Sequence, residues 1–447
     1  MRHLEAFTIP ELGELKVHRP IDMGHPVSLL STLTSLRTLV ISSGWMLSAG
    51  LGRAIAALRP TLTAQSPPFS LTILSWRHKT HYSGQCILSD EENNTPEHFR
   101  YTIRSTHDFF AALNPHSVTS MDIDFAARLA TDLLGLGEIV IRQARSLRAI
   151  RIAGLRAEHS RLLAVFTQMA TEGWAPVALR LDDLCLSYPS QADWRSFRPM
   201  CAGLRSLELA RWEGMWRFAE DVVDEFVRLK VCVMVWDCRF GCDEMFLLYT
   251  LPRLAGSLTT LKLVDTDHNM WSPVRPAGRM VYEEDAGEWG LLESLVGLRT
   301  LVLTGDVAGW LIGDRLEAVL DALGGTLVTC DLSLSAKEID GTKLQAFTRC
   351  RNLERLMLRE WSWDATRDIS PPGRSRKMTV EVVKDFLDRC NYVSVGSDRV
   401  QLVLQDLGIA GGLLEVAGEK NWGELKEWAG AQGTIFNWNA AEMPLTP

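Results

Sequence analysis

The sequence has no excess of positive charge. Its 47 Lys and Arg residues are outnumbered by 55 Asp and Glu residues, which gives a formal net charge of -8. A protein that binds nucleic acid through its phosphates normally carries a basic surplus, concentrated on one face or in one segment. The charge balance therefore argues against a nucleic-acid partner.

Long hydrophobic runs are absent as well. The longest, Val231 to Trp236, is far shorter than the roughly 20 residues that a helix needs to cross a bilayer. The first residues, Met1 to Glu5, are largely charged, and the apolar segment of a signal peptide does not follow them. We expect no membrane partner and no targeting segment.

Cysteine is sparse and mostly scattered, and Cys238 and Cys242 have no matching Cys or His pair. The chain has nine cysteines, an odd number, and Cys232 and Cys330 lie inside apolar segments. That usage is typical of reduced, buried thiols in a cytoplasmic or nuclear protein. Tryptophan is abundant, at 15 residues; packing in the core explains this more simply than binding does, although large aromatic residues are also enriched at interfaces.

Catalytic and metal-binding patterns are missing. His78 and His81 lie near a cysteine but lack a full set of zinc ligands. Asp122 and Asp124 share the exposed face of one strand, where two carboxylates can bind a cation or act as acid and base but more often are two charges on an open sheet. The glycine-rich segment 408–420 lacks the Gly-Lys-Ser/Thr ending of a phosphate-binding loop. We therefore expect a non-catalytic protein with no cofactor and no metal.

One short pattern, Leu-x-x-Leu-x-Leu, returns along most of the chain. Close copies begin at Leu36, Leu147, Leu204, Leu258, Leu298 and Leu353, and looser copies begin at Val118 and Leu327. Self-similarity of this kind is the signature of a solenoid, in which each unit buries its apolar edge against the neighbouring units.

The unit at Leu298 to Thr304 shows the physical logic. Side chains alternate along a strand, so Leu301 and Leu303 point to one side and Thr300, Val302 and Thr304 point to the other. The leucines are expected in the core, and the other set on the open face of a parallel sheet.

Amphipathic segments separate the strands. Helical periodicity appears in 158–171, 218–227 and 315–323 and again after Thr379, which can cap a helix. Strands without the motif are expected near 69–74, 179–186, 230–235 and 400–404, the last of these closing the array, and the first strand at 4–9 or 12–17. The predicted fold is an α/β leucine-rich-repeat solenoid (a horseshoe) of irregular long repeats, with short parallel strands on the concave face and helices on the convex face.

The array predicts one solenoid domain over residues 1–447. Polar insertions interrupt it near 77–100, 265–289 and 362–378. Insertions in solenoids tend to fall on one face, often the binding face, but long loops without structure of their own are also frequently disordered. Each of the three insertions is therefore either part of a binding face or a disordered loop.

The repeats resemble the leucine-rich region of fungal F-box/leucine-rich-repeat proteins. The resemblance runs from Leu36 to about Leu404 and includes the late stretch Leu356 to Trp363, followed by Thr379 to Cys390. It implies a repeat array that holds a substrate for ubiquitination. Members of the family usually carry an F-box ahead of the repeats, which docks on the adaptor of a cullin ubiquitin ligase. No Leu-Pro-x-Glu helical module precedes the repeats here, so we expect a missing or separate module to supply the ligase contact.

Strand geometry also predicts the binding residues, which are the outward-facing positions of the repeat strands. Their mixed charge suits a protein partner better than a phosphate backbone. We expect a monomer that binds a protein, either a ubiquitination substrate or, as a plain scaffold, a partner unrelated to ubiquitin. An enzyme with a site on the insertions near His78, Asp265 and His268 is the remaining alternative. The predicted partner-binding residues are Thr38, Val40, Arg151, Ser206, Glu208, Thr260, Lys262, Thr300, Val302, Asp331, Arg355, Met357 and Arg359.

Overall fold

The structure is a computed structural model of the whole chain. It describes a series of segments of the chain. These are residues 6–9, 33, 35–41, 49–58, 69–73, 108–124, 140–187, 194–212, 214–236, 250–254, 256–265, 291–305, 307–308, 312, 315–334, 341–360, 380–393, 401–405, 419–431 and 435–438.

The chain divides into two compact units, residues 1–228 and residues 229–447. Each unit is built around its own run of parallel strands. In both, a short strand, a connection and a helix or turn make up one repeat, so both have the architecture of a leucine-rich-repeat solenoid.

The sheet of unit 1 follows the chain order from one strand to the next. Every pairing is parallel and in register, so that Ala6 pairs with Thr38, Thr38 with Ser70 and Ser70 with Ser120. The strands are β1 (Ala6–Ile9), β2 (Thr38–Ile41), β3 (Ser70–Ile73), β4 (Ser120–Asp124), β5 (Ala149–Ala153), β7 (Ala178–Asp182) and β9 (Ser206–Ala210).

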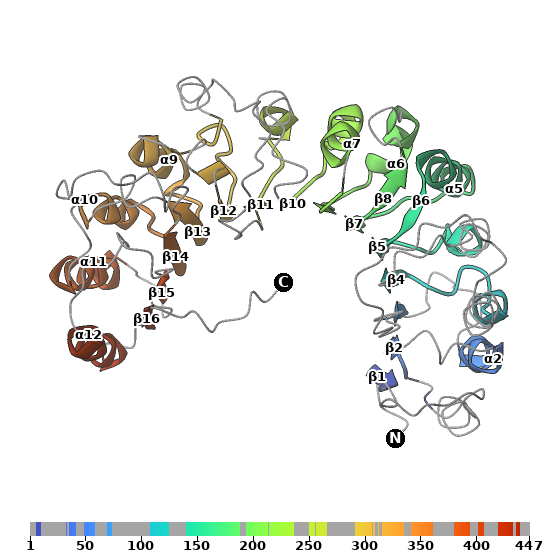
Figure 1. Cartoon of the computed structure of the whole chain (residues 1–447), viewed down its shortest axis with the longest axis horizontal. Coiled ribbons are helices and arrows are strands. Elements are labelled where there is room, and N and C mark those ends of the chain that lie inside the picture. The colour runs from blue at the N-terminus through green and yellow to red at the C-terminus, as the bar shows by residue number, and fades with distance from the viewer. Residues whose placement is uncertain are drawn as a thin grey trace, which may run out of the picture. The chain divides into compact units, whose positions relative to one another are not determined.

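Helices cover one face of this sheet and leave the other face open, which Figure 1 shows for unit 1. The open face is called the inner face below. The covering elements are α2 (Ala49–Leu58), α5 (His159–Thr171), α6 (Arg198–Cys201) and α7 (Met215–Val222), with the 3-10 turns η3 (Trp194–Phe197) and η4 (Val223–Glu225). A second small parallel sheet, β6 (Arg156–Glu158) with β8 (Cys185–Ser187), follows the ends of β5 and β7.

Unit 2 repeats this arrangement with its own parallel strands and helices. Val231 pairs with Thr260, and the register continues strand by strand to Leu404 and Trp438. The strands are β10 (Val231–Trp236), β11 (Thr260–Asp265), β12 (Thr300–Thr304), β13 (Thr329–Leu334), β14 (Arg355–Glu360), β15 (Gln401–Gln405) and β16 (Phe436–Trp438). The helices and turns are η6 (Leu251–Leu254), α9 (Leu316–Leu323), α10 (Gly341–Leu344), η9 (Gln345–Arg349), α11 (Val380–Val393) and α12 (Glu419–Ala431).

Alternation along the strands confirms the predicted orientation of the repeat. Leu301 and Leu303 are almost fully buried, whereas Thr300 and Val302 are half-buried on the inner face. Thr304 departs from the prediction, because it is buried rather than outward. The fifth strand position is also buried at Ala153, Asp182, Ala210 and Ser333, whereas Val264, the partner of Thr304 on β11, is half-buried.

A tight turn follows the buried residue at Ala153, Asp182, Ala210 and Thr304, but not at Ser333. The residue that follows the fifth position has a left-handed backbone at Gly154, Asp183, Arg211 and Gly305. The turn directs the chain toward the helical layer, so that the fifth residue lies beneath the turn instead of facing solvent. Backbone bonds continue across neighbouring turns, from the Gly154 amide to the Asp182 carbonyl and from the Asp183 amide to the Ala210 carbonyl.

Aromatic side chains fill the helical layer of unit 1. Trp194 makes edge-to-face contacts with Trp212 and Phe218, with ring centroids 5.8 and 5.5 Å apart. Phe166 stacks on Trp174, whose indole nitrogen donates to the Leu147 carbonyl at 3.0 Å. These tryptophans are buried, as the packing interpretation predicts.

The described residues confirm several of the predicted helices and strands and correct one prediction. The helices predicted at 158–171 and 315–323 correspond to α5 and α9, and the strand at 230–235 corresponds to β10. The first strand lies at Ala6–Ile9, and the prediction that 400–404 closes the array is wrong, because α12 and β16 follow β15. The insertions 77–100 and 362–378 and nearly all of 265–289 lie outside the described residues.

Among the described helices, none has both the length and the apolar character that crossing a bilayer requires.

Candidate protein-binding face

Two rows of side chains run across the inner face of unit 1, one residue per strand in each row. The first row contains only small residues: Thr38, Ser70, Ser120, Ala149, Ala178 and Ser206. The second row begins with Val40 and Thr72 and continues with the charged residues Asp122, Arg151, Arg180 and Glu208. All of these residues are half-buried.

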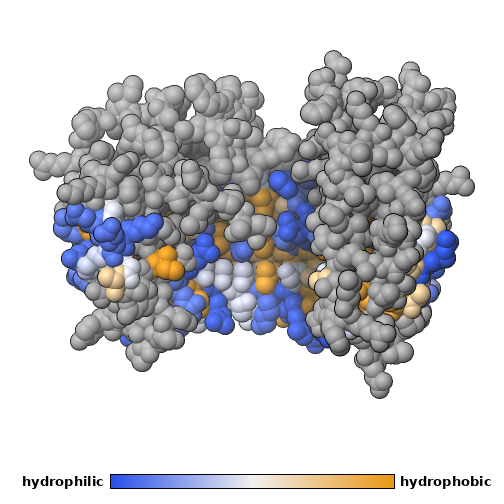
Figure 2. Space-filling model, turned by 90° about the horizontal axis from the view of Figure 1, so that it is seen from below, coloured by the Kyte–Doolittle hydropathy of each residue, from blue (hydrophilic) through white to orange (hydrophobic). Residues whose placement is uncertain are grey.

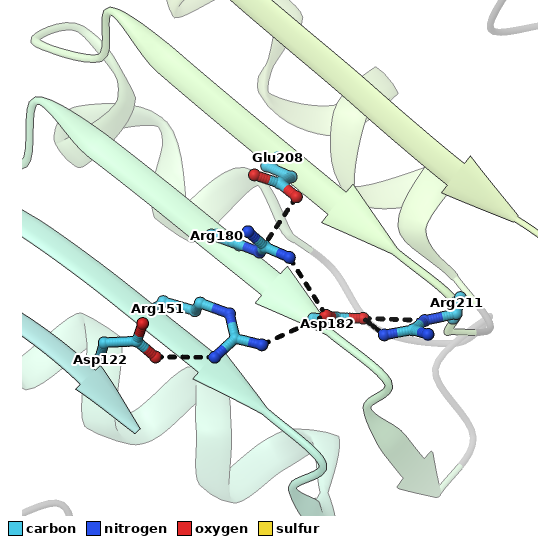
Figure 3. Close-up of polar contacts among 6 residues, drawn as sticks. All are labelled: Asp122, Arg151, Arg180, Asp182, Glu208 and Arg211. Atoms are coloured by element: carbon cyan, nitrogen blue, oxygen red, sulfur yellow. Dashed lines mark hydrogen bonds and ion pairs between the residues drawn. The ribbon is translucent and has the colours of Figure 1, made fainter. Parts of the chain in front are cut away.

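The charged residues of the second row pair with their neighbours across the strands. A nitrogen of the Arg151 guanidinium, Nη1, donates to Oδ1 of Asp122 at 2.8 Å. Arg180 Nε lies 3.0 Å from Oε1 of Glu208, an ion pair without hydrogen-bond alignment. Figure 3 shows these contacts following the direction across the sheet, from β4 to β5 and from β7 to β9.

Asp182, at the fifth position of β7, lies at the centre of the cluster. Its side chain is only 2% exposed, and three guanidinium groups approach it (Figure 3). Arg211 donates to Oδ1 from Nε at 3.0 Å and from Nη2 at 2.7 Å. The second oxygen, Oδ2, lies 3.6 Å from Arg151 Nη2 and 3.5 Å from Arg180 Nη2.

These contacts hold the arginines in place. A buried carboxylate with hydrogen-bonded cationic partners is compensated for its lost hydration. Arg151 and Arg180 each have a carboxylate on two sides, and they remain 21% and 32% exposed. The result is a fixed set of guanidinium groups whose remaining surface faces solvent.

The inner face of unit 2 mixes hydroxyl, apolar and charged residues. One row contains Thr260, Thr300 and Thr329 and continues to Arg355, and the parallel row contains Lys262, Val302, Asp331 and Met357. Lys262, Val302 and Asp331 are half-buried. Seen from below, the described surface of the molecule mixes hydrophilic, intermediate and hydrophobic side chains (Figure 2).

The register places the sequence-predicted binding residues on the inner faces of their units. Thr38, Val40, Arg151, Ser206 and Glu208 belong to the two rows of unit 1. Thr260, Lys262, Thr300, Val302, Asp331, Arg355 and Met357 belong to those of unit 2.

Two of these positions differ from the others. Met357 is only 7% exposed despite its outward register. The Arg359 side chain lies outside the described residues, although its backbone pairs with Ser333 and Gln405.

Sequence reasoning missed three members of the charged cluster. Arg180 lies in the strand Ala178–Asp182, where the Leu-x-x-Leu-x-Leu motif is incomplete. The alternation around Leu179 and Leu181 was the signal that could have placed Arg180 outward. No local pattern indicates that Asp182 is buried or that Arg211 contacts it, because that contact depends on the turn after β9.

Metal chemistry finds no support among the described residues. Within them, no group of three or more His, Cys, Asp or Glu side chains is placed to hold an ion. Asp122 is paired with Arg151 instead. His78, His81 and His268 lie outside the described residues, as does the basic run 374–377.

The described cysteines are buried thiols. Cys201, Cys232, Cys330 and Cys350 are free. Burial raises the pKa of the Cys232 thiol to about 12, and burial together with the nearby Glu225 carboxylate raises the pKa of Cys201 to about 12. Such thiols are poor nucleophiles and poor metal ligands, because both roles need the thiolate.

Comparisons with known proteins place the chain in no family. No family model matches the sequence, and no curated protein matches it. Among solved structures, the chain is similar to one described as the crystal structure of the Rad7 and Elc1 complex in yeast, at 12% identity and a TM-score of 0.43. The match covers 92% of this chain and 90% of that one. The classification as a leucine-rich-repeat solenoid therefore depends on the parallel sheets and repeat register described above.

Proposed function

We propose that this protein is a non-catalytic leucine-rich-repeat solenoid that binds another protein through the inner faces of its sheets. The observation that supports the proposal most strongly is the charged row of unit 1, where Arg151 and Arg180 are held in fixed positions and still face solvent. Arginine is among the residues that contribute most to the stability of protein interfaces. Fixing such side chains in advance reduces the entropy lost on binding.

The signs of the charges favour a protein over a nucleic acid. Asp122 and Glu208 flank the two arginines and bring the row to charge balance. A phosphate backbone favours surfaces with a net positive charge, whereas protein partners tolerate alternating signs and use them for specificity. The valine and threonines of unit 2 add apolar and hydroxyl surface of the kind found in protein interfaces.

Site-specific photo-crosslinking tests the proposal. A benzophenone amino acid at Val302, on the inner face of β12, is expected to capture the partner in cells. The matched control places it at Glu427, an exposed position on α12. A single protein captured from position 302 and not from 427 supports the proposal; capture from the outer position alone contradicts it.

The resemblance of the repeats to F-box/leucine-rich-repeat proteins supports a more specific role. In that role the captured partner is a substrate for ubiquitination, and a missing or separate module contacts the ligase. Affinity purification of the intact gene product is then expected to recover a Skp-type adaptor. Recovery of the inner-face partner without an adaptor would contradict the ligase role, and the protein would then be a binding scaffold unrelated to ubiquitin.

A further inference from the structure

The inner face of unit 1 carries a specific order of charge. Along β4, β5, β7 and β9, the second row contains Asp122, Arg151, Arg180 and Glu208, which gives the order negative, positive, positive, negative. We propose, building on the proposed function, that this row recognises an α-helix of a protein partner lying across the strands. The helix carries the opposite order: basic, acidic, acidic, basic.

Spacing favours a helix over an extended chain. Neighbouring strands lie about 4.8 Å apart, so the row from β4 to β9 spans roughly 14 Å. Helix positions i, i+3, i+7 and i+10 share one face and span about 15 Å at 1.5 Å per residue. Four side chains on one face of an extended strand span about 20 Å, because they recur every second residue. Only the helix presents one side chain to each strand.

The row of small residues beside the charges leaves room for such a helix. No side chain in this row is larger than threonine: Thr38, Ser70, Ser120, Ala149, Ala178 and Ser206. The arginines of the second row are longer, and their guanidinium groups pair with Asp122, Glu208 and Asp182. A partner backbone can therefore approach the sheet over the small residues while its charged side chains reach the charged row.

The buried Asp182 helps to fix the positions of the two arginines at the centre of the row. Its Oδ2 lies within 3.6 Å of both Arg151 and Arg180, which draws both guanidinium groups toward the end of the strands. Asp122 and Glu208 hold the same two arginines from the outer sides. The exposed parts of the two arginines, 21% and 32% of their side chains, are the surface that a partner's carboxylates can reach.

Two synthetic peptides provide the test, with the full chain as the receptor. The first is a 20-residue alanine-rich helix with Lys, Glu, Glu and Lys at positions i, i+3, i+7 and i+10, and the second places Glu, Lys, Lys and Glu at the same positions. The two have the same composition and net charge. Fluorescence polarisation at low salt is expected to show at least tenfold tighter binding of the first peptide, and the difference should shrink as salt rises.

Variants of the full chain assign the effect to the row. Arg180→Gln removes one central positive charge and is expected to weaken binding of the first peptide at least fivefold. Arg198→Gln is the matched control, because Arg198 on α6 is similarly exposed and also pairs with a carboxylate, that of Asp224. Should Arg180→Gln fail to fold in a thermal melt, the order dependence of the two peptides on the unmodified chain decides alone.

The outcomes separate this inference from the proposed function. Equal affinity for the two peptides, no binding of the first peptide, or equal effects of the two variants would overturn the helix inference. If crosslinking from position 302 nevertheless captures a protein partner, the proposed function stands without it. A tighter first peptide whose binding Arg180→Gln selectively weakens supports the assignment of this face to a helix with the charge order basic, acidic, acidic, basic.

Discussion

Asp182 accepts two hydrogen bonds from Arg211, at 3.0 and 2.7 Å, where the Arg211 backbone is left-handed with φ of 55°. A left-handed backbone is uncommon for residues other than glycine, and it persists where neighbouring contacts compensate for its strain. The same carboxylate approaches Arg151 and Arg180 on β5 and β7. One buried side chain therefore connects the turn after β9 to the charged row of unit 1.

Replacing Asp182 by Asn should destabilise the fold. The change keeps the shape of the side chain but removes the charge that three guanidinium groups face. Because those arginines are partly solvated, we expect a loss of about 1–3 kcal/mol in the free energy of unfolding. Urea denaturation followed by circular dichroism measures it.

Asp224→Asn is the control for this change. Asp224 also pairs with an arginine, Arg198, at 3.3 Å, but both side chains are more than one-third exposed. Exposed pairs contribute about 0–1 kcal/mol. If the two variants lose the same stability, burial does not set the contribution of Asp182.

The repeat register predicts opposite effects at adjacent residues of β12. Leu301→Asp places a charge between Leu261 and Cys330 of the flanking strands, inside the core. We expect it to cost more than about 3 kcal/mol. Thr300→Asp, on the inner face, should stay within about 0.5 kcal/mol of the parent. Thermal melts of both variants compare them, and equal midpoints would contradict the assignment of faces.

Strand positions were largely predictable because leucine spacing is a local signal. The core residues Leu261, Leu301 and Leu356 follow from it directly, since each lies in one motif and pairs in register with the next strand. β16 was missed because Phe436–Trp438 has only three residues and no leucine. A strand this short has no periodicity to read.

The charged cluster was only partly predictable, for a different reason. Arg151 and Glu208 follow from alternation within their own strands. The burial of Asp182 depends on the left-handed turn at Asp183 and on an arginine 29 residues away in the chain. Contacts between repeats depend on how neighbouring strands align, and the sequence of one strand does not show that alignment.

Two glycines of unit 2 should respond oppositely to alanine. Gly305 has φ of 78°, and a Cβ there would lie 2.5 Å from Cβ of Asp265. Gly305→Ala is therefore expected to destabilise the protein by at least about 1–2 kcal/mol. Gly325, after α9, has open space around its would-be Cβ, and Gly325→Ala should be neutral or slightly stabilising. Chemical denaturation of the pair checks both, and a neutral Gly305→Ala would show that the turn after β12 can rearrange.

Buried thiols predict both slow alkylation and a loss of stability at high pH. Burial raises the pKa of Cys232 from 9.0 to about 12, so at pH 8 its thiolate is about a thousandfold rarer in the folded protein than in the unfolded chain. Mass spectrometry after brief iodoacetamide treatment at pH 8 should therefore find Cys232 unmodified without denaturant and modified with it.

The sign of the pH effect follows from proton binding. Above pH 9 the unfolded chain loses the Cys232 proton while the folded state keeps it, so the folded state binds more protons and its stability falls as pH rises from 9 toward 12. Cys232→Ala removes this contribution and should flatten the decline between pH 9 and 10.5, leaving the pH dependence below 8 unchanged. Parallel decline of the two proteins in urea denaturation across that interval would show that the Cys232 thiol is not protected by burial.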